Sequence, residues 1–131
     1  MSLKNKIIIP AAMAGMLAIA VPTVGLDEGL RLVPYRDING VWTICHGDTV
    51  DVSVNQRETK ESCSAMLQMR LIYFGSRVRA MVKTPMSESR WAGLTSFAYN
   101  VGLGNFEKST LLKKLNAKDP NACEQILRWQ Y

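Results

Sequence analysis

Apolar side chains in the middle of the chain recur at intervals of three and four residues, the spacing of one face of an amphipathic α-helix. The pattern predicts a helix from about Thr59 to Val82, with Thr59 as its N-terminal cap and Gly75 weakening its middle. Pro85 lies just beyond the predicted end. The apolar stripe consists of Cys63, Met66, Leu67, Leu71, Phe74, Val78, Met81 and Val82.

The same periodicity predicts three shorter helices in the C-terminal part. The first is capped by Ser87, ends at Gly102 and Gly104, and has an inner face of Trp91, Leu94, Phe97, Ala98 and Val101. The second begins at Ser109 and carries Leu111, Leu112 and Leu115. The third begins at Asp119-Pro120, runs to the chain end and carries Ile126, Leu127 and Trp129.

The stretch from Val33 to Val50 has the features of a small β-hairpin. Asn39-Gly40 suits a type I′ turn, in which both central residues have positive φ, and the β-forming residues 41–44 follow it directly. Residues 48–57 are polar and predict a loop. A small hairpin lobe followed by a helical lobe indicates an α+β fold, and a cleft between the lobes is the natural place for a ligand.

The N-terminal segment is an uncharged, alanine-rich run from Ile7 to Leu26 that follows Lys4 and Lys6. It has about the 20 residues that a helix needs to span a bilayer, and the preceding lysines orient the rest of the chain outward. Three interpretations follow: a signal peptide cleaved at the A-x-A site Ala18-Ile19-Ala20, an uncleaved and loosely held anchor, or a buried helix of a soluble protein. We expect export by one of the first two routes.

The composition, 47% hydrophobic and 21% charged over 131 residues, is that of a globular protein. We therefore expect a signal segment, residues 1–26, and one domain, residues 27–131. The net charge of +5 favours an anionic partner, and nucleic acid, anionic lipid and bacterial wall polymer all qualify. The three cysteines form no CxxC pair and no cluster with the single histidine, so we expect no metal site and no cofactor. We expect that histidine, His46, to be a hydrogen-bonded structural residue.

The segment from Asp27 to Thr43, DEGLRLVPYRDINGVWT, carries the candidate chemistry. Glu28 would end the helix that enters the hairpin, Asp37 would lie at the tip of the first strand, and Thr43 would lie on the return strand. Glycoside hydrolysis needs two carboxyl groups, a protonated one for the leaving oxygen and an ionised one that activates water or attacks the sugar. Taken alone, acidic residues in loops are usually just solvated, so this pair needs further context.

That context is a resemblance to the phage lysozyme or endolysin family, glycoside hydrolase family 24. The first motif is E-x8-D-x5-T within EGLRLxxYxDxxGxWT, and the second is RWAGLTSFAYNVGLGNFEKSTLLKKLN, residues 90–116. The resemblance implies a lysozyme-like fold with Glu28 as general acid, Asp37 as general base or electrostatic partner, and Thr43 positioning the attacking water. It also implies that Tyr99, Asn100 and Ser109 line the sugar-binding cleft, although Tyr99 also suits a core aromatic and Ser109 a helix cap.

The apolar N-terminus resembles that of the signal-anchor-release endolysins. This implies an enzyme tethered to the inner membrane through residues 7–26 and later released into the periplasm of a Gram-negative host. The implied activity is hydrolysis of the β-1,4 bonds of peptidoglycan between N-acetylmuramic acid and N-acetylglucosamine, for host lysis. We expect a monomer that binds peptidoglycan and no nucleic acid.

The chain departs from the family pattern at its C-terminal end, where members usually continue for a further helical segment. The alternative function is therefore an inactive, truncated prophage remnant that binds the wall without turnover. By resemblance to related exported endolysins we expect a Cys45–Cys63 disulfide and a free thiol at Cys123, whose partner in those relatives lies near the C-terminus.

Overall fold

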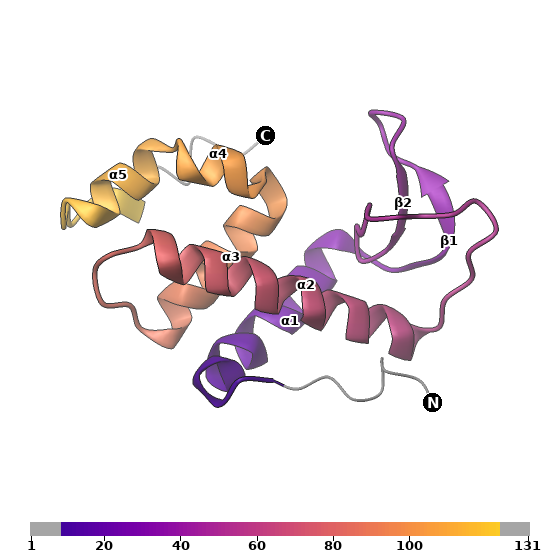
Figure 1. Cartoon of the computed structure of the whole chain (residues 1–131), viewed down its shortest axis with the longest axis horizontal. Helices are drawn as coiled ribbons and strands as arrows, with labels where there is room; N and C mark the ends of the chain where they lie inside the picture. Colours follow the sequence, from indigo (N-terminus) through magenta and orange to yellow (C-terminus); the bar gives the residue numbers. More distant parts are fainter. Residues whose placement is uncertain (1–8, 124–131) are drawn as a thin grey trace. The chain divides into compact units, whose positions relative to one another are not determined.

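The computed structural model describes residues 9–123, with the backbone alone for residues 26–28. It divides into a first unit, residues 1–72, and a second unit, residues 73–131. The predicted α+β class is confirmed, because a two-stranded sheet is combined with helices (Figure 1). The elements in chain order are η2 Ala11–Met13, α1 Ala14–Glu28, β1 Arg31–Arg36, β2 Trp42–Cys45, α2 Lys60–Met81, α3 Glu88–Val101, α4 Leu103–Glu107 and α5 Thr110–Asn116.

The first unit begins with the apolar segment, which forms η2 and α1. Within this segment the buried side chains are Met13, Met16, Leu17, Ala20 and Val24. The helix continues to Glu28, so it carries the chain directly into the hairpin. Across the described residues no helix combines the length and apolar character needed to cross a membrane. The first residues of the predicted run, Ile7 and Ile8, lie outside the described part.

The hairpin is confirmed, and β1 and β2 lie side by side as antiparallel strands (Figure 1). Tyr35 pairs with Thr43 and Arg36 with Trp42, whereas the register shifts between Tyr35 and Arg31. Pro34 lies within this shifted stretch, and proline has no N–H to donate to a ladder. The irregular pairing therefore coincides with the one residue of β1 that cannot make a full set of backbone hydrogen bonds.

The turn between the strands differs from the predicted type I′ turn. Gly40 has a φ of 78°, but Asn39 is not among the residues with positive φ. Gly40 N donates to Asp37 O at 2.9 Å and Asp37 N donates to Val41 O at 3.0 Å. This pattern is that of a three-residue loop with a single left-handed residue, which needs only one glycine.

A disulfide between Cys45 and Cys63 joins the end of the hairpin to α2, as predicted, and Cys123 is free and exposed. Both bridged residues are buried beside Ile44, with Val52 and Met66 packed against this cluster. An ion pair makes a second link, because Arg70 Nε of α2 lies 3.3 Å from Oδ2 of the buried Asp48. Hence one covalent bond and one ion pair hold the hairpin against the N-terminal half of α2.

The long helix α2 matches the predicted Thr59–Val82 segment. Its predicted cap is confirmed, since Ser62 N donates to Thr59 Oγ1 at 3.0 Å. Five positions of the predicted stripe are buried, and three, Met66, Phe74 and Met81, are half-buried. The buried positions are Cys63, Leu67, Leu71, Val78 and Val82.

The second unit contains the end of α2 and the helices α3, α4 and α5 (Figure 1). The predicted caps are confirmed: Ser87 Oγ accepts from Arg90 N, and Ser109 Oγ accepts from Leu112 N. Gly102 ends α3 as predicted, with a φ of 95°, but Gly104 lies inside the short helix α4, which the sequence pattern did not predict. The predicted final helix begins within the described residues, where residues 120–121 form a turn and 122–123 are in 3-10 conformation. Its remaining part, with Ile126, Leu127 and Trp129, lies outside the described residues.

The chain that follows α2 is held by the side chain of Asn116, the last residue of α5. Its Oδ1 accepts from Lys83 N at 2.7 Å and its Nδ2 donates to Met81 O at 3.0 Å. Thr84 Oγ1 also donates to Leu115 O at 3.4 Å. The two bonds of Asn116 satisfy backbone groups just where α2 ends, where a helix leaves its last carbonyl groups without intrahelical partners.

We predict that removing the disulfide lowers the free energy of unfolding by about 3 kcal/mol, because the bridge closes a loop between cysteines 18 residues apart. The variant replaces Cys45 and Cys63 with alanine in a Cys123→Ser chain, and its reference is Cys123→Ser alone. Guanidinium unfolding followed by circular dichroism measures the difference. Equal midpoints for the two proteins would contradict the prediction.

We predict that Asn116→Ala costs about 1–3 kcal/mol of stability, because Lys83 N and Met81 O lose their partner together. Urea denaturation is the measurement. The matched control is Asn55→Ala in the exposed loop, which should stay within about 0.5 kcal/mol of the parent. An Asn116→Ala midpoint equal to that of the control would mean that these two hydrogen bonds do not stabilise the fold.

Candidate active site

The carboxylate of Asp37 organises the hairpin turn. Its Oδ1 accepts hydrogen bonds from Asn39 N at 2.8 Å and Val41 N at 2.9 Å. This is the arrangement in which an aspartate side chain substitutes for a backbone acceptor in a turn. Within residues 9–123 no hydrogen bond to its other oxygen, Oδ2, is made, and the residue is half-buried. One oxygen therefore holds the turn while the other is available to a ligand or a water.

Thr43 lies on β2, is only 3% exposed, and donates its Oγ1 proton to Val41 O at 2.9 Å. The peptide groups of Val41 therefore connect two of the predicted catalytic residues, with the N–H bonded to Asp37 and the carbonyl oxygen to Thr43. Because the hydroxyl proton is engaged, the free lone pairs of Thr43 Oγ1 can accept a hydrogen bond from a water. The structure thus brings Asp37 and Thr43 together at one end of the hairpin.

Glu28 is the last residue of α1, as expected, and its side chain lies outside the described part of the structure. Gly29 follows it with a φ of 71°, a conformation that glycine adopts without steric cost. The carbonyl oxygen of Gly29 lies 2.7 Å from His46 Nδ1, just after β2. Since a carbonyl oxygen only accepts, Nδ1 carries the proton in this bond.

The predicted structural role of His46 is confirmed by this hydrogen bond. A Cβ atom added to Gly25 would lie 3.7 Å from Cε1 of His46, so the imidazole also packs close to the last turns of α1. The sequence pattern identified His46 as structural but did not indicate its partner. The hydrogen bond of His46 holds the backbone at Gly29, the residue that directly follows the end of the helix at Glu28.

The three residues expected to contact sugar lie in the second unit. Tyr99 is half-buried on α3 with its ring 5.3 Å from that of Phe74, and Asn100 beside it is exposed. Ser109 is 7% exposed, accepts from Leu112 N, and donates to Phe106 O at 2.6 Å. The cap interpretation of Ser109 is therefore confirmed, whereas contact of these residues with sugar stays a prediction.

The sequence pattern did not indicate that Val41 belongs to the site. Val41 acts through its backbone, and backbone hydrogen bonding leaves no trace in residue type. Arg36 is a second missed neighbour, with its guanidinium 4.9 Å from the centre of the Trp42 ring beside Thr43. The spacing of basic and aromatic residues on facing strands is the one signal that would have indicated this contact.

Known proteins are similar to this chain over the hairpin and the helices that follow it. The model of the family described as phage lysozyme matches residues 26–131. The chain is 43% identical over 106 residues to a SAR-endolysin of Enterobacteria phage PA-2, covering 79% of this chain and 64% of that protein. It is 39% identical over 132 residues to a SAR-endolysin of Bacteriophage PS34, covering 95% of this chain and 79% of that protein.

Solved structures are similar over most of the chain. The muramidase domain of SpmX from Asticaccaulis excentricus matches with a TM-score of 0.78 and 27% identity, over 93% of this chain and 79% of that one. A P22 lysozyme variant matches with a TM-score of 0.72 and 27% identity, over 95% and 85%. The chain spans 64% of the length of its SAR-endolysin relatives from phages PA-2 and P21, which is less than two thirds.

We predict that Asp37→Ala and Asp37→Asn differ in stability. The alanine variant loses both hydrogen bonds that Oδ1 accepts and should lose about 1 kcal/mol or more, whereas the asparagine variant keeps an oxygen that accepts both and should stay within about 0.5 kcal/mol. Thermal unfolding of the two variants and the parent measures the effect. Equal losses in both variants would mean that the turn depends on the charge of Asp37 rather than on its accepting oxygen.

Proposed function

This chain belongs to the phage lysozyme family, and from that premise we propose that it hydrolyses bacterial peptidoglycan. The bond cut is the β-1,4 linkage between N-acetylmuramic acid and N-acetylglucosamine, and the biological role is lysis of the host. The observation that carries the proposal is the pair of hydrogen bonds that links Asp37 to Thr43 through Val41. The hairpin that contains these residues follows directly after the helix α1, which ends at Glu28.

We assign the general acid role to Glu28. It would give its proton to the glycosidic oxygen as that bond breaks, so it must be protonated when substrate binds. Its place at the last position of α1 supports the role, because the backbone beside it is held by the bond between Gly29 O and His46 Nδ1. Removal of the leaving sugar then leaves a positive charge developing on the ring that remains.

Asp37 would act on that developing charge as general base or electrostatic partner. Its Oδ2 makes no hydrogen bond among the described residues, so it can accept the proton of an attacking water. Thr43 Oγ1 would hold the same water through a lone pair. Attack by water from the face opposite the leaving group inverts the anomeric centre, and this requires carboxyl groups about 6.5–9.5 Å apart.

Tyr99 and Asn100 are the residues of the second unit that we propose contact the sugar. The amide of Asn100 is exposed and can both donate to and accept from sugar hydroxyl groups, and Tyr99 is a half-buried aromatic residue beside it. Ser109 can add only an accepted hydrogen bond, because its proton is bound to Phe106 O.

We further propose that residues 7–26 tether the chain to the inner membrane before its release into the periplasm of a Gram-negative host. Lys4 and Lys6 before the apolar run support this topology, as does the similarity to relatives that are SAR-endolysins. In the released form the apolar side chains no longer contact lipid and must be buried by protein instead. Met16, Leu17 and Ala20 are buried in the folded structure. The intact mass of the periplasmic protein distinguishes release of the uncleaved helix from cleavage after Ala20.

We predict that Glu28→Gln lowers the rate of peptidoglycan hydrolysis by a factor of about 100 or more, because glutamine keeps the shape but has no acidic proton to transfer. Release of reducing ends from purified peptidoglycan by the full chain is the measurement. The control is Glu61→Gln, which neutralises an exposed carboxylate in the first turn of α2 and should leave the rate unchanged.

The second measurement is the binding of the parent and of Glu28→Gln to sedimented peptidoglycan. Retained binding by Glu28→Gln together with loss of hydrolysis supports a catalytic role for Glu28. Binding without hydrolysis in the parent would instead support a wall-binding protein without turnover, and the absence of binding and hydrolysis would overturn the proposed function.

A further inference from the structure

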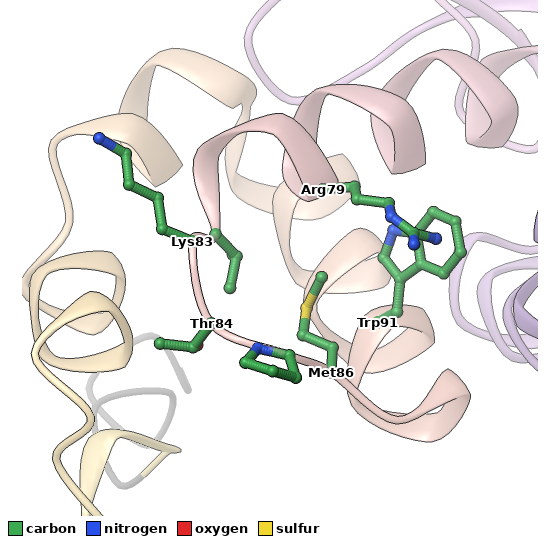
Figure 2. Close-up of a pocket in the computed structure, with 7 residues that line it drawn as sticks. Arg79, Lys83, Thr84, Met86 and Trp91 are labelled. Atoms are coloured by element: carbon green, nitrogen blue, oxygen red, sulfur yellow. The ribbon is translucent and has the colours of Figure 1, made fainter.

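A preformed pocket lies in the second unit, between the end of α2 and the start of α3 (Figure 2). Its volume is about 250 Å³, just below the range of about 300–1,000 Å³ of ligand sites, so it suits a group of few heavy atoms. Seven residues line it and none of them is acidic. The pocket includes none of the residues assigned to hydrolysis.

Arg79 presents a positioned guanidinium at one side of the pocket. Its Cζ lies 4.7 Å from the centre of the Trp91 ring, and Figure 2 shows the guanidinium beside the indole. The indole is itself held, because Trp91 Nε1 donates to Gly75 O at 2.8 Å. A guanidinium stacked on an aromatic face keeps its in-plane N–H groups free for an acceptor.

The charge of Arg79 is unpaired in the part of the chain that the structure describes. The ion pairs there are Arg70 with Asp48 and Lys114 with Asp119. Lys83 lies at the opposite side, also exposed and without an ion pair among those residues, and its side chain extends away from Arg79 (Figure 2). The pocket therefore has a positive potential with one fixed donor group and one more distant cation.

The remaining lining is mainly apolar and does not depend on a ligand for its shape. Val82 is buried, Pro85 and Met86 add apolar surface, and Met86 lies between Thr84 and Trp91 in Figure 2. The segment that carries these residues is held to α5 by the hydrogen bonds of Asn116 and by Thr84 Oγ1 to Leu115 O. A pocket held in this way loses little conformational entropy on binding.

From this combination we propose that the pocket binds the terminal carboxylate of a short peptide with small aliphatic side chains. The carboxylate accepts two parallel hydrogen bonds from Arg79, and the small aliphatic groups contact Val82, Pro85 and Met86. The stem peptides of peptidoglycan have this chemistry, ending in a carboxylate next to methyl groups. The inference that the peptide comes from the bacterial wall rests on the proposed function, whereas the binding of a peptide carboxylate by Arg79 does not.

The test uses the full chain labelled with ¹⁵N in its indole groups and the probe acetyl-D-alanyl-D-alanine. The indole N–H resonance of Trp91, assigned with a Trp91→Phe variant, should shift and saturate as the probe is added. Arg79→Gln should weaken binding about tenfold, because it removes a charged hydrogen-bonding group. Arg79→Lys, which keeps the charge but loses the planar fork, should fall between Arg79→Gln and the parent.

The matched control is Arg77→Gln, an exposed arginine two residues earlier on α2 whose guanidinium lies over Tyr73 and which does not line the pocket. It should bind the probe as the parent does, and Lys83→Gln should bind more weakly than the parent but better than Arg79→Gln. The probe with its carboxylate replaced by an amide should not shift Trp91. Thermal unfolding of each variant shows whether the fold is intact.

Three results would overturn the proposal. They are equal affinity of Arg79→Gln and Arg77→Gln, equal binding of the acid and amide probes, and inorganic phosphate binding as tightly as the peptide. The first would mean that Arg79 only shields Trp91 from water. Because no glycosidic bond is cut in this experiment, its outcome is independent of the Glu28→Gln test. If the probe bound saturably and the parent chain did not hydrolyse peptidoglycan, the protein would bind peptides but would not be the proposed enzyme.

Discussion

The peptide groups of Val41 hydrogen-bond to Asp37 through the N–H and to Thr43 through the carbonyl oxygen. Both residues are therefore positioned by one short stretch of backbone. A catalytic carboxylate must sit within a fraction of an ångström of its working position, which side-chain rotamers alone do not ensure. Here one oxygen of Asp37 provides the positioning and the other is left for chemistry. The same residue thus serves the fold and the proposed reaction.

This turn is useful only if the hairpin is itself fixed to the helices around it. Within the first unit three links of different kinds do so. The disulfide at Cys45 and the ion pair between Asp48 and Arg70 connect the hairpin to α2. His46 connects it to Gly29, the residue after the proposed acid. All three begin within a few residues of the end of β2, so the return strand is the part of the sheet that is tied to both helices.

In the second unit a backbone group of α2 positions a side chain of α3. Gly75 is buried in α2, where it costs helical stability relative to alanine, and its carbonyl oxygen accepts the indole proton of Trp91. That bond satisfies the polar group of a large buried side chain. It also orients the ring on which Arg79 stacks. A backbone carbonyl group in the middle of α2 therefore helps to build the positively charged pocket.

The sequence by itself determined the elements whose hydrogen bonds are local. Thr59, Ser87 and Ser109 each cap a helix by accepting from a residue three positions later, and the apolar periodicity of the helices follows from the same short range. The family motif, read from the chain, also indicated which acids and which cysteines to expect. Only the tertiary structure decided the turn type, the role of Val41, and the pairs that join distant segments. Those pairs are Trp91 with Gly75, Arg70 with Asp48, and Asn116 with Lys83, separated by 16, 22 and 33 residues. Their existence depends on how the chain packs, because residue type states what a side chain can bond to but not which partner folding brings within reach.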